Sequence, residues 1–127
     1  MAEVITNEVY GKNYHATSAG INVFGKCPMQ YDALAALQRA GYDVTKIHHV
    51  SRRLTYDMVK AADIVIAVNC RYASALHAAY PDCAGKITCF ANDIDIPYDG
   101  DTVGYDRCFY ELCEGIESIL CPGGFRG

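Results

Sequence analysis

The chain has 127 residues, of which 51% are hydrophobic and 20% charged, and its net charge is −4. This length matches one average domain, and the apolar content excludes an intrinsically disordered chain. Nucleic acid and anionic membrane surfaces are disfavoured as partners, because both require clustered Lys and Arg and the chain offers only the pair Arg52 and Arg53. We therefore expect a single globular domain over residues 1–127.

Export, membrane insertion and metal binding are not expected either. The opening residues MAEVITNEVYGKNY lack the basic and apolar segments of an export signal, and no apolar run reaches the roughly 20 residues of a membrane span. These features predict a cytoplasmic protein. The seven cysteines show no CxxC spacing and are expected to be reduced and mostly buried, with no metal or cofactor. They are Cys27, Cys70, Cys83, Cys89, Cys108, Cys113 and Cys121.

The first half of the chain predicts two helices with a short strand between them. Apolar residues at helical spacing indicate a helix over 1–10, and the segment 14–18 is typical of a strand. A loop over 21–28 then leads into a helix over 29–40. Gly41 stands where the C-terminal cap of that helix belongs.

The second half alternates helices and strands. Thr55 is the expected N-cap of a helix over 56–62, and the β-branched run at 64–68 is the strongest strand signal. The pattern then predicts, in order, a helix over 71–80, a strand over 87–90 and a helix over 103–120. Such alternation implies an α/β fold with a parallel sheet, in which ligands bind beyond the carboxyl ends of the strands.

Four segments in this order resemble the low-molecular-weight protein tyrosine phosphatase family, including its bacterial arginine phosphatase branch. They are MAE at 1–3, TSAGINVFG at 17–25, HVSRRLT at 49–55 with ADIVIAV at 62–68, and DIDIPYDGDTVGY at 93–105. The resemblance covers most of the chain. It implies a three-layer α/β fold, in which a short parallel sheet is flanked by helices.

The same resemblance implies that the first strand and the catalytic loop of the family are missing from these 127 residues. In the family, five residues separate the nucleophilic Cys from a phosphate-binding Arg, and a segment like MAE follows that loop almost directly. The thiolate attacks phosphorus, while the Arg and backbone N–H groups hold the phosphoryl oxygens. Cys121 and Arg126 come closest to this pattern, but only four residues separate them, and we expect no working loop there.

The general acid of the family is implied to be missing as well. In the family it is an Asp directly before a Pro-aromatic pair, and it protonates the leaving group. Here Ile96 precedes the Pro-Tyr pair, and a hydrocarbon side chain cannot donate that proton. One of the nearby Asp93, Asp95 and Asp99 could replace it, although loop carboxylates are more often simply solvated.

Other matched positions belong to residues that support catalysis in the family. The resemblance implies that Ser18 hydrogen-bonds the phosphate loop, that His49 buttresses it, and that Tyr98 forms a wall of the substrate cleft. Arg52 is implied to be structural, tying a loop to a carboxylate. Without the loop, we interpret Ser18 as a strand-end hydroxyl, His49 as a partly buried imidazole, and Tyr98 as either a cleft wall or an ordinary loop residue.

Loss of the first strand has a structural consequence, because in the family that strand lies in the middle of the sheet. Its absence would leave two rows of backbone groups unpaired, at about 1–3 kcal/mol for each buried group. We therefore expect the segments 14–18 and 64–68 to pair directly, or to be bridged by a segment of another chain or by the tail at 121–127. A homodimer is the favoured arrangement.

Two functions remain open from the sequence. The favoured one is a non-catalytic phosphatase-fold protein that acts in binding or assembly, through a homodimer or an unidentified protein partner. The alternative is a fragment of an active tyrosine or arginine phosphatase whose first strand and loop lie outside these residues. Ile96 favours the first, because a misplaced start explains a missing N-terminus but not a missing acid. An arsenate reductase of the same fold ranks third, since it also needs the absent loop cysteine.

Overall fold

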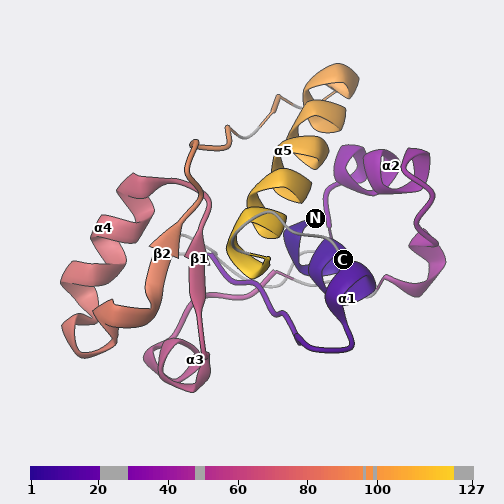
Figure 1. Cartoon of the computed structure of the whole chain (residues 1–127). Helices are drawn as coiled ribbons and strands as arrows, with labels where there is room; N and C mark the ends of the chain where they lie inside the picture. The colour runs from indigo at the N-terminus through magenta and orange to yellow at the C-terminus, as the bar shows by residue number, and fades with distance from the viewer. Residues whose placement is uncertain (21–28, 48–50, 96, 99, 122–127) are drawn as a thin grey trace. The chain divides into compact units, whose positions relative to one another are not determined.

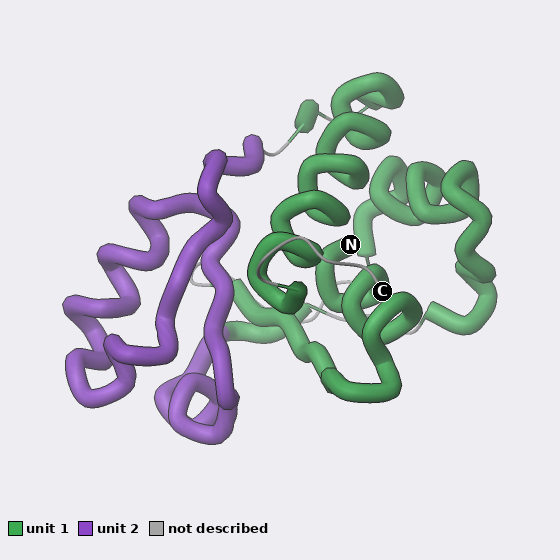
Figure 2. Tube along the Cα trace, viewed as in Figure 1, with its two compact units in different colours: residues 1–53, 96–127 green, residues 54–95 purple. Residues whose placement is uncertain are grey.

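The computed structural model describes residues 1–20, 29–47, 51–95, 97–98 and 100–121 (Figure 1). The chain divides into two compact units, which we call unit 1 (residues 1–53 and 96–127) and unit 2 (residues 54–95) (Figure 2). Each unit has a buried apolar cluster of its own. The single domain expected from the sequence stays a prediction.

Unit 2 contains a short parallel sheet with a helix packed on it. Its elements are α3 (Tyr56–Ala61), β1 (Val65–Ala67), α4 (Cys70–Ala79), the 3₁₀ helix η2 (Pro81–Lys86) and β2 (Ile87–Cys89). β1 and β2 pair in parallel, with Val65 opposite Ile87 and Ala67 opposite Cys89. α4 lies between the two strands in the chain and packs against both (Figure 1). This arrangement confirms the predicted α/β fold, because parallel strands need such a helical crossover.

Side chains directly before α3 and α4 cap the N-termini of these helices, and an apolar cluster packs the helices against the sheet. Thr55 Oγ1 accepts a hydrogen bond from the Met58 backbone N–H at 3.3 Å, and Asn69 Oδ1 accepts one from Tyr72 at 2.9 Å. Each cap satisfies a backbone donor that has no partner inside its helix. The buried cluster consists of Val59, Ala67, Ala73, Leu76, Cys83 and Ile87.

Unit 1 is built around one long helix. Its elements are α1 (Ala2–Tyr10), α2 (Tyr31–Arg39), the 3₁₀ helix η1 (Val44–Lys46) and α5 (Thr102–Leu120). α5 packs against both α1 and α2. Each of these three helices turns an apolar stripe inward, and Ile5, Leu37 and Ile116 are buried at 1%, 0% and 2% exposure. Within the described ranges, no helix is both long and apolar enough to span a bilayer.

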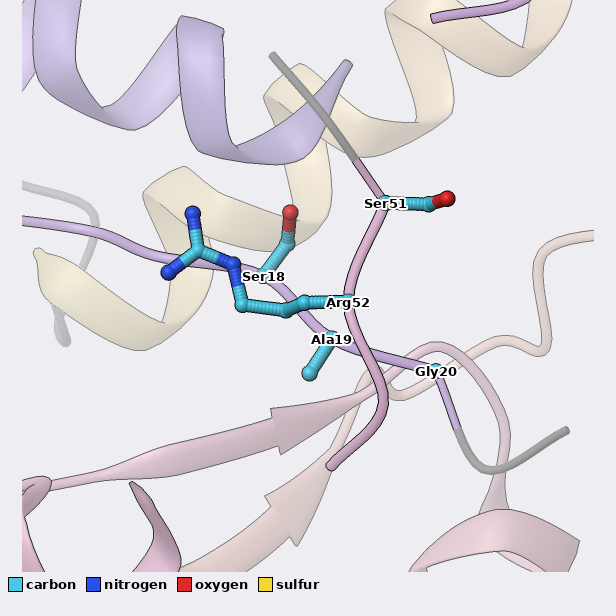
Figure 3. Close-up of a pocket in the computed structure, with 5 residues that line it drawn as sticks. All are labelled: Ser18, Ala19, Gly20, Ser51 and Arg52. Carbon is cyan, nitrogen blue, oxygen red and sulfur yellow. The ribbon is translucent and has the colours of Figure 1, made fainter. Parts of the chain in front are cut away.

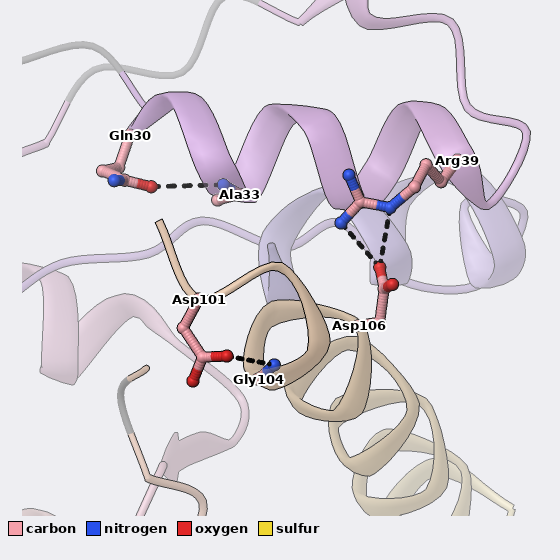
Figure 4. A network of polar contacts seen from close by, with 6 residues as sticks. All are labelled: Gln30, Ala33, Arg39, Asp101, Gly104 and Asp106. Atoms are coloured by element: carbon pink, nitrogen blue, oxygen red, sulfur yellow. Dashed lines mark hydrogen bonds and ion pairs between the residues drawn. The ribbon is translucent and has the colours of Figure 1, made fainter. Parts of the chain in front are cut away.

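Polar contacts fix the ends of α2 and α5 and join the two helices (Figure 4). Gln30 Oε1 accepts hydrogen bonds from the first backbone N–H groups of α2 at 2.8 and 3.2 Å. Asp101 Oδ1 does the same for α5, accepting from the Gly104 backbone N–H at 2.9 Å. Arg39 pairs with Asp106 at 2.7 Å, and because both side chains are 41% exposed this ion pair contributes at most about 1 kcal/mol.

The cap of α5 gives a testable prediction, because a Cβ atom added at the buried Gly104 would overlap the Asp101 carboxylate. Replacing a helical Gly by Ala normally stabilises by about 1 kcal/mol. Here the methyl group would displace the cap, whose loss costs about 0.5–2 kcal/mol. We expect Gly104→Ala to be about 1 kcal/mol more favourable in an Asp101→Ala background than in the natural chain. Urea unfolding of the four chains measures this difference, and equal effects in both backgrounds would contradict the overlap.

Most elements predicted from the sequence are confirmed. The helices agree with α1, α2, α3, α4 and α5 to within two residues, and the two buried apolar runs are β1 and β2. Gly41 has a φ of 98°, as its predicted position at the end of α2 requires. The predicted strand at 14–18 is wrong, because none of these residues is in a strand. The loop predicted over 21–28 lies outside the described residues.

Candidate functional site

Two side chains of α1 hold the segment that leads to Ser18. Asn7 Nδ2 donates to the Ala16 carbonyl at 2.9 Å, and the Ala16 backbone N–H donates to Asn7 Oδ1 at 2.7 Å. One turn earlier on α1, Glu3 Oε1 accepts a hydrogen bond from the Ser18 hydroxyl at 3.0 Å. The Asn7 amide thus takes both backbone groups of Ala16, which a neighbouring strand would otherwise pair, and this explains why the segment is not a strand.

A short backbone contact brings the end of this segment to a second loop of unit 1. The Gly20 backbone N–H donates to the Arg52 carbonyl at 2.9 Å, which makes a parallel bridge between Gly20 and Arg53. The two stretches together line a pocket of about 150 Å³ (Figure 3), whose lining residues are Ser18, Ala19, Gly20, Ser51 and Arg52. Pockets for drug-sized ligands measure roughly 300–1,000 Å³, so this one suits a small polar group or an anion.

Arg52 supplies the positive charge of this pocket. Its side chain is exposed, and its guanidinium has no hydrogen bond or ion pair within the part of the chain that the structure describes. In Figure 3 it extends toward the Ser18 side of the pocket, whereas the Ser51 side chain points away. A guanidinium presents a planar fork of N–H donors that matches phosphate and carboxylate oxygens. The described lining can therefore hold an anion, but it contains no thiol and no acid to break a phosphate ester.

The structure brings together two of the residues that the sequence singled out. Ser18 and Arg52 line the same pocket. The structural role expected for Arg52, tying a loop to a carboxylate, is wrong for the described residues, because none of their carboxylates pairs with it. His49 and Ile96 lie outside the described residues. Tyr98 is 84% exposed and does not line the pocket, and its carbonyl accepts a hydrogen bond from a backbone N–H at 3.0 Å.

The residues that could replace the family's catalytic groups lie in separate surroundings. Asp93 belongs to unit 2 and accepts a hydrogen bond from the Cys70 backbone N–H at 3.0 Å. Asp95 is exposed, and Asp99 lies outside the described residues. Cys121 directly follows α5, whereas Arg126, with which it comes closest to the family's loop pattern, lies outside the described residues.

Sequence reasoning missed the residues that position Ser18. Neither Glu3, which lies inside the matched MAE segment, nor Asn7 is among the predicted site residues. The available signal was their spacing, because positions 3 and 7 are one helical turn apart and place two polar side chains on one face of a short helix. That spacing alone does not identify their partners, which follow α1 in the chain.

Comparisons with known proteins give the identity of the fold. The family model described as low molecular weight phosphotyrosine protein phosphatase matches residues 1–121. No curated protein is significantly similar to the chain in sequence. Among solved structures, the low molecular weight protein tyrosine phosphatase from T. tengcongensis is 26% identical, with a TM-score of 0.81 over 94% of this chain and 86% of that one.

Two further solved structures share the fold at lower identity. A YwlE mutant from Bacillus subtilis has a TM-score of 0.82 at 20% identity, covering 93% of this chain and 84% of that one. Vibrio vulnificus Wzb, solved with benzylphosphonate, has a TM-score of 0.80 at 21% identity, covering 93% of this chain and 85% of that one. With the family model matched over 121 of the 127 residues, the chain belongs to the low molecular weight phosphotyrosine protein phosphatase family.

Proposed function

We propose that this 127-residue chain is a non-catalytic member of its family, which binds or assembles without hydrolysing phosphate esters. The observation that carries the proposal is Ile96, which stands at the position of the family's general acid. It is an interior position, so this argument does not depend on where the chain begins. The sec-butyl hydrocarbon side chain of Ile96 has no acidic proton to give to a leaving oxygen.

A second feature of the sequence supports the proposal. The family's chemistry needs a thiolate nucleophile and an Arg six positions after it, which holds the phosphoryl oxygens during the attack. None of the seven cysteines in these 127 residues is followed by an Arg at that spacing. As the chain stands, both the attacking group and the proton donor of the reaction are lacking.

The groups that remain favour binding. Arg52 is an exposed cation, and Ser18 places a hydroxyl on the same small pocket. Assembly as a homodimer is part of the same proposal, because β1 and β2 form a two-stranded sheet and such a sheet has outer edges that another strand can cover. A cytoplasmic location and the absence of a cofactor also stay proposals.

The second candidate function is phosphatase catalysis by a longer form of the protein. It is favoured by the family match and by the coverage of the solved relatives, since the chain spans 86% of the phosphatase from T. tengcongensis. In that case a strand and a Cys-(x)5-Arg loop would precede Met1. The DNA directly upstream of the start codon distinguishes the two candidates, because the second requires an in-frame sequence of that kind.

An activity assay tests the proposal. The purified 127-residue chain is expected to hydrolyse neither para-nitrophenyl phosphate nor phosphoarginine above a buffer blank, and Ile96→Asp alone should leave it inactive because no nucleophile is present. The matched control is a chain extended by a strand and a Cys-(x)5-Arg loop, assayed with Ile96 and with Asp at position 96. Hydrolysis by the unextended chain that a single Cys→Ser change abolishes would overturn the proposal.

A further inference from the structure

Two cysteines meet at the carboxyl end of the parallel sheet in unit 2. Cys70 is the first residue of α4, which begins just beyond the carboxyl end of β1, and Cys89 is the last residue of β2. Because β1 and β2 are parallel, their carboxyl ends lie at the same end of the sheet. Parallel α/β sheets usually place functional groups at this end.

The two thiols are in direct contact. Their Sγ atoms are 2.6 Å apart, closer than the roughly 3.5–4.0 Å at which even the smaller carbon atoms rest without a bond. A disulfide bond measures about 2.05 Å, so a further approach of about 0.5 Å would join the two sulfurs. Such a small movement can be made by side-chain rotation, without separating β2 from α4.

The backbone around the pair is held in place. Asp93 Oδ1 accepts a hydrogen bond from the Cys70 backbone N–H at 3.0 Å, and the Ile94 backbone N–H donates to the Val68 carbonyl at 3.1 Å. The loop after β2 is therefore tied to the stretch between β1 and α4. These hydrogen bonds fix the backbone positions of the two cysteines relative to one another, as a preformed disulfide site requires.

The pair is also open to a reagent, and it is distinct from the other cysteines. Cys70 is exposed and Cys89 half-buried, whereas Cys83 and Cys108 are buried. No other two cysteine sulfurs are in contact among residues 1–20, 29–47, 51–95 and 100–121. No group of three or more metal-ligating side chains occurs in these ranges either, which favours a bond between the sulfurs over a shared metal ion.

We propose that Cys70 and Cys89 form a reversible redox site, in which a disulfide joins the start of α4 to the end of β2 when the protein meets an oxidant such as glutathione disulfide. One cysteine thiolate attacks a sulfur of the oxidant and releases one glutathione thiolate. The thiolate of the second cysteine then attacks the mixed disulfide and releases the other. Two cysteine thiols are oxidised to one disulfide, and one glutathione disulfide is reduced to two glutathione thiols.

The reduced form of this pair is expected in the absence of oxidant. The hydrogen bond with Cys89, more than burial or the nearby Asp93, raises the pKa of Cys70 to about 11. At neutral pH the Cys70 sulfur is therefore almost entirely a thiol, and thiols exchange far more slowly than thiolates. That the cysteines of the untreated protein are reduced stays a prediction.

Peptide mapping of the full chain tests the proposal, because trypsin separates the relevant cysteines. Cleavage after Lys and Arg places Cys70, Cys83 and Cys89 alone in the peptides 61–71, 72–86 and 87–107. After treatment with glutathione disulfide and alkylation of the remaining thiols, we expect peptides 61–71 and 87–107 to be linked and about 2 Da lighter than their sum. Dithiothreitol should restore two labelled peptides, while Cys83 stays labelled throughout.

Matched variants make the result specific. Cys70→Ser and Cys89→Ser should each abolish the linked peptide, while Cys121→Ser, which removes another half-buried cysteine, should leave it unchanged. Oxidation should also raise the melting temperature of the natural chain by roughly 5–10 °C, because it closes the loop between positions 70 and 89, and it should not do so in Cys70→Ser. Full labelling of Cys70 and Cys89 after oxidation, or a different linked pair, would overturn the proposal.

Discussion

Leu37→Ala is expected to lower the free energy of unfolding by about 2–5 kcal/mol, the largest effect of any single substitution considered for this chain. Leu37 lies in the last turn of α2 and is 0% exposed, so its side chain is completely enclosed within unit 1. Truncation removes the transfer free energy of the buried methyl and methylene groups and leaves a cavity. A total stability of about 5–15 kcal/mol is usual for a domain, so the variant should be close to unfolding.

Leu34→Ala is the matched control, since Leu34 lies one turn earlier on α2 and is only half-buried. It makes the same chemical change in the same helix, so helix propensity cancels from the comparison. We expect its loss of stability to be less than half that of Leu37→Ala. Urea unfolding followed by circular dichroism measures both variants, and equal losses would contradict the placement of Leu37 at the centre of the core.

Asn7→Ala is expected to release the segment that carries Ser18. The substitution removes both hydrogen bonds between the Asn7 amide and Ala16, at 2.7 and 2.9 Å. It also leaves a partly buried backbone N–H and carbonyl without a protein partner, a loss of about 1–2 kcal/mol. Hydrogen exchange of the Ala16 amide should accordingly become roughly 5- to 30-fold faster.

The control for this prediction is Glu8→Ala, which changes the neighbouring, exposed residue of α1 and should leave exchange at Ala16 unchanged. Asn7→Asp is informative as well. Its carboxylate can still accept from the Ala16 N–H but cannot donate to the Ala16 carbonyl, so its effect should be intermediate. Unchanged protection of Ala16 in Asn7→Ala would mean that a different contact holds the segment.

Local features of the sequence predict the helices and both strands of unit 2. Thr55 begins α3 through its own side chain, Gly41 ends α2 because it adopts a positive φ, and the apolar run around Ile66 needs no distant information to be identified as a buried strand. These signals operate over a few residues. They can therefore be identified in the sequence without any knowledge of the packing.

The segment 14–18 shows a feature that local signals cannot predict. A strand exists only if a neighbour pairs with it, and in unit 1 the groups of Ala16 are paired by the side chain of Asn7, nine positions away in the chain. The pocket has the same long-range origin, because Ser18 and Arg52 meet through the backbone bond of Gly20. The resemblance to a family singled out Ser18 and Arg52 but not their shared pocket, and no residue pattern predicted the contact between Cys70 and Cys89.

The division of the chain also sets the order in which its parts become available during synthesis. Residues 54–95 form an uninterrupted stretch, so every segment of unit 2 is synthesised before α5. Unit 1 needs α5 as the packing partner of both α1 and α2. α1 and α2 must therefore wait for α5, and until it is made their apolar stripes have no α5 to cover them. The core of unit 1 therefore cannot close during synthesis until α5 is available.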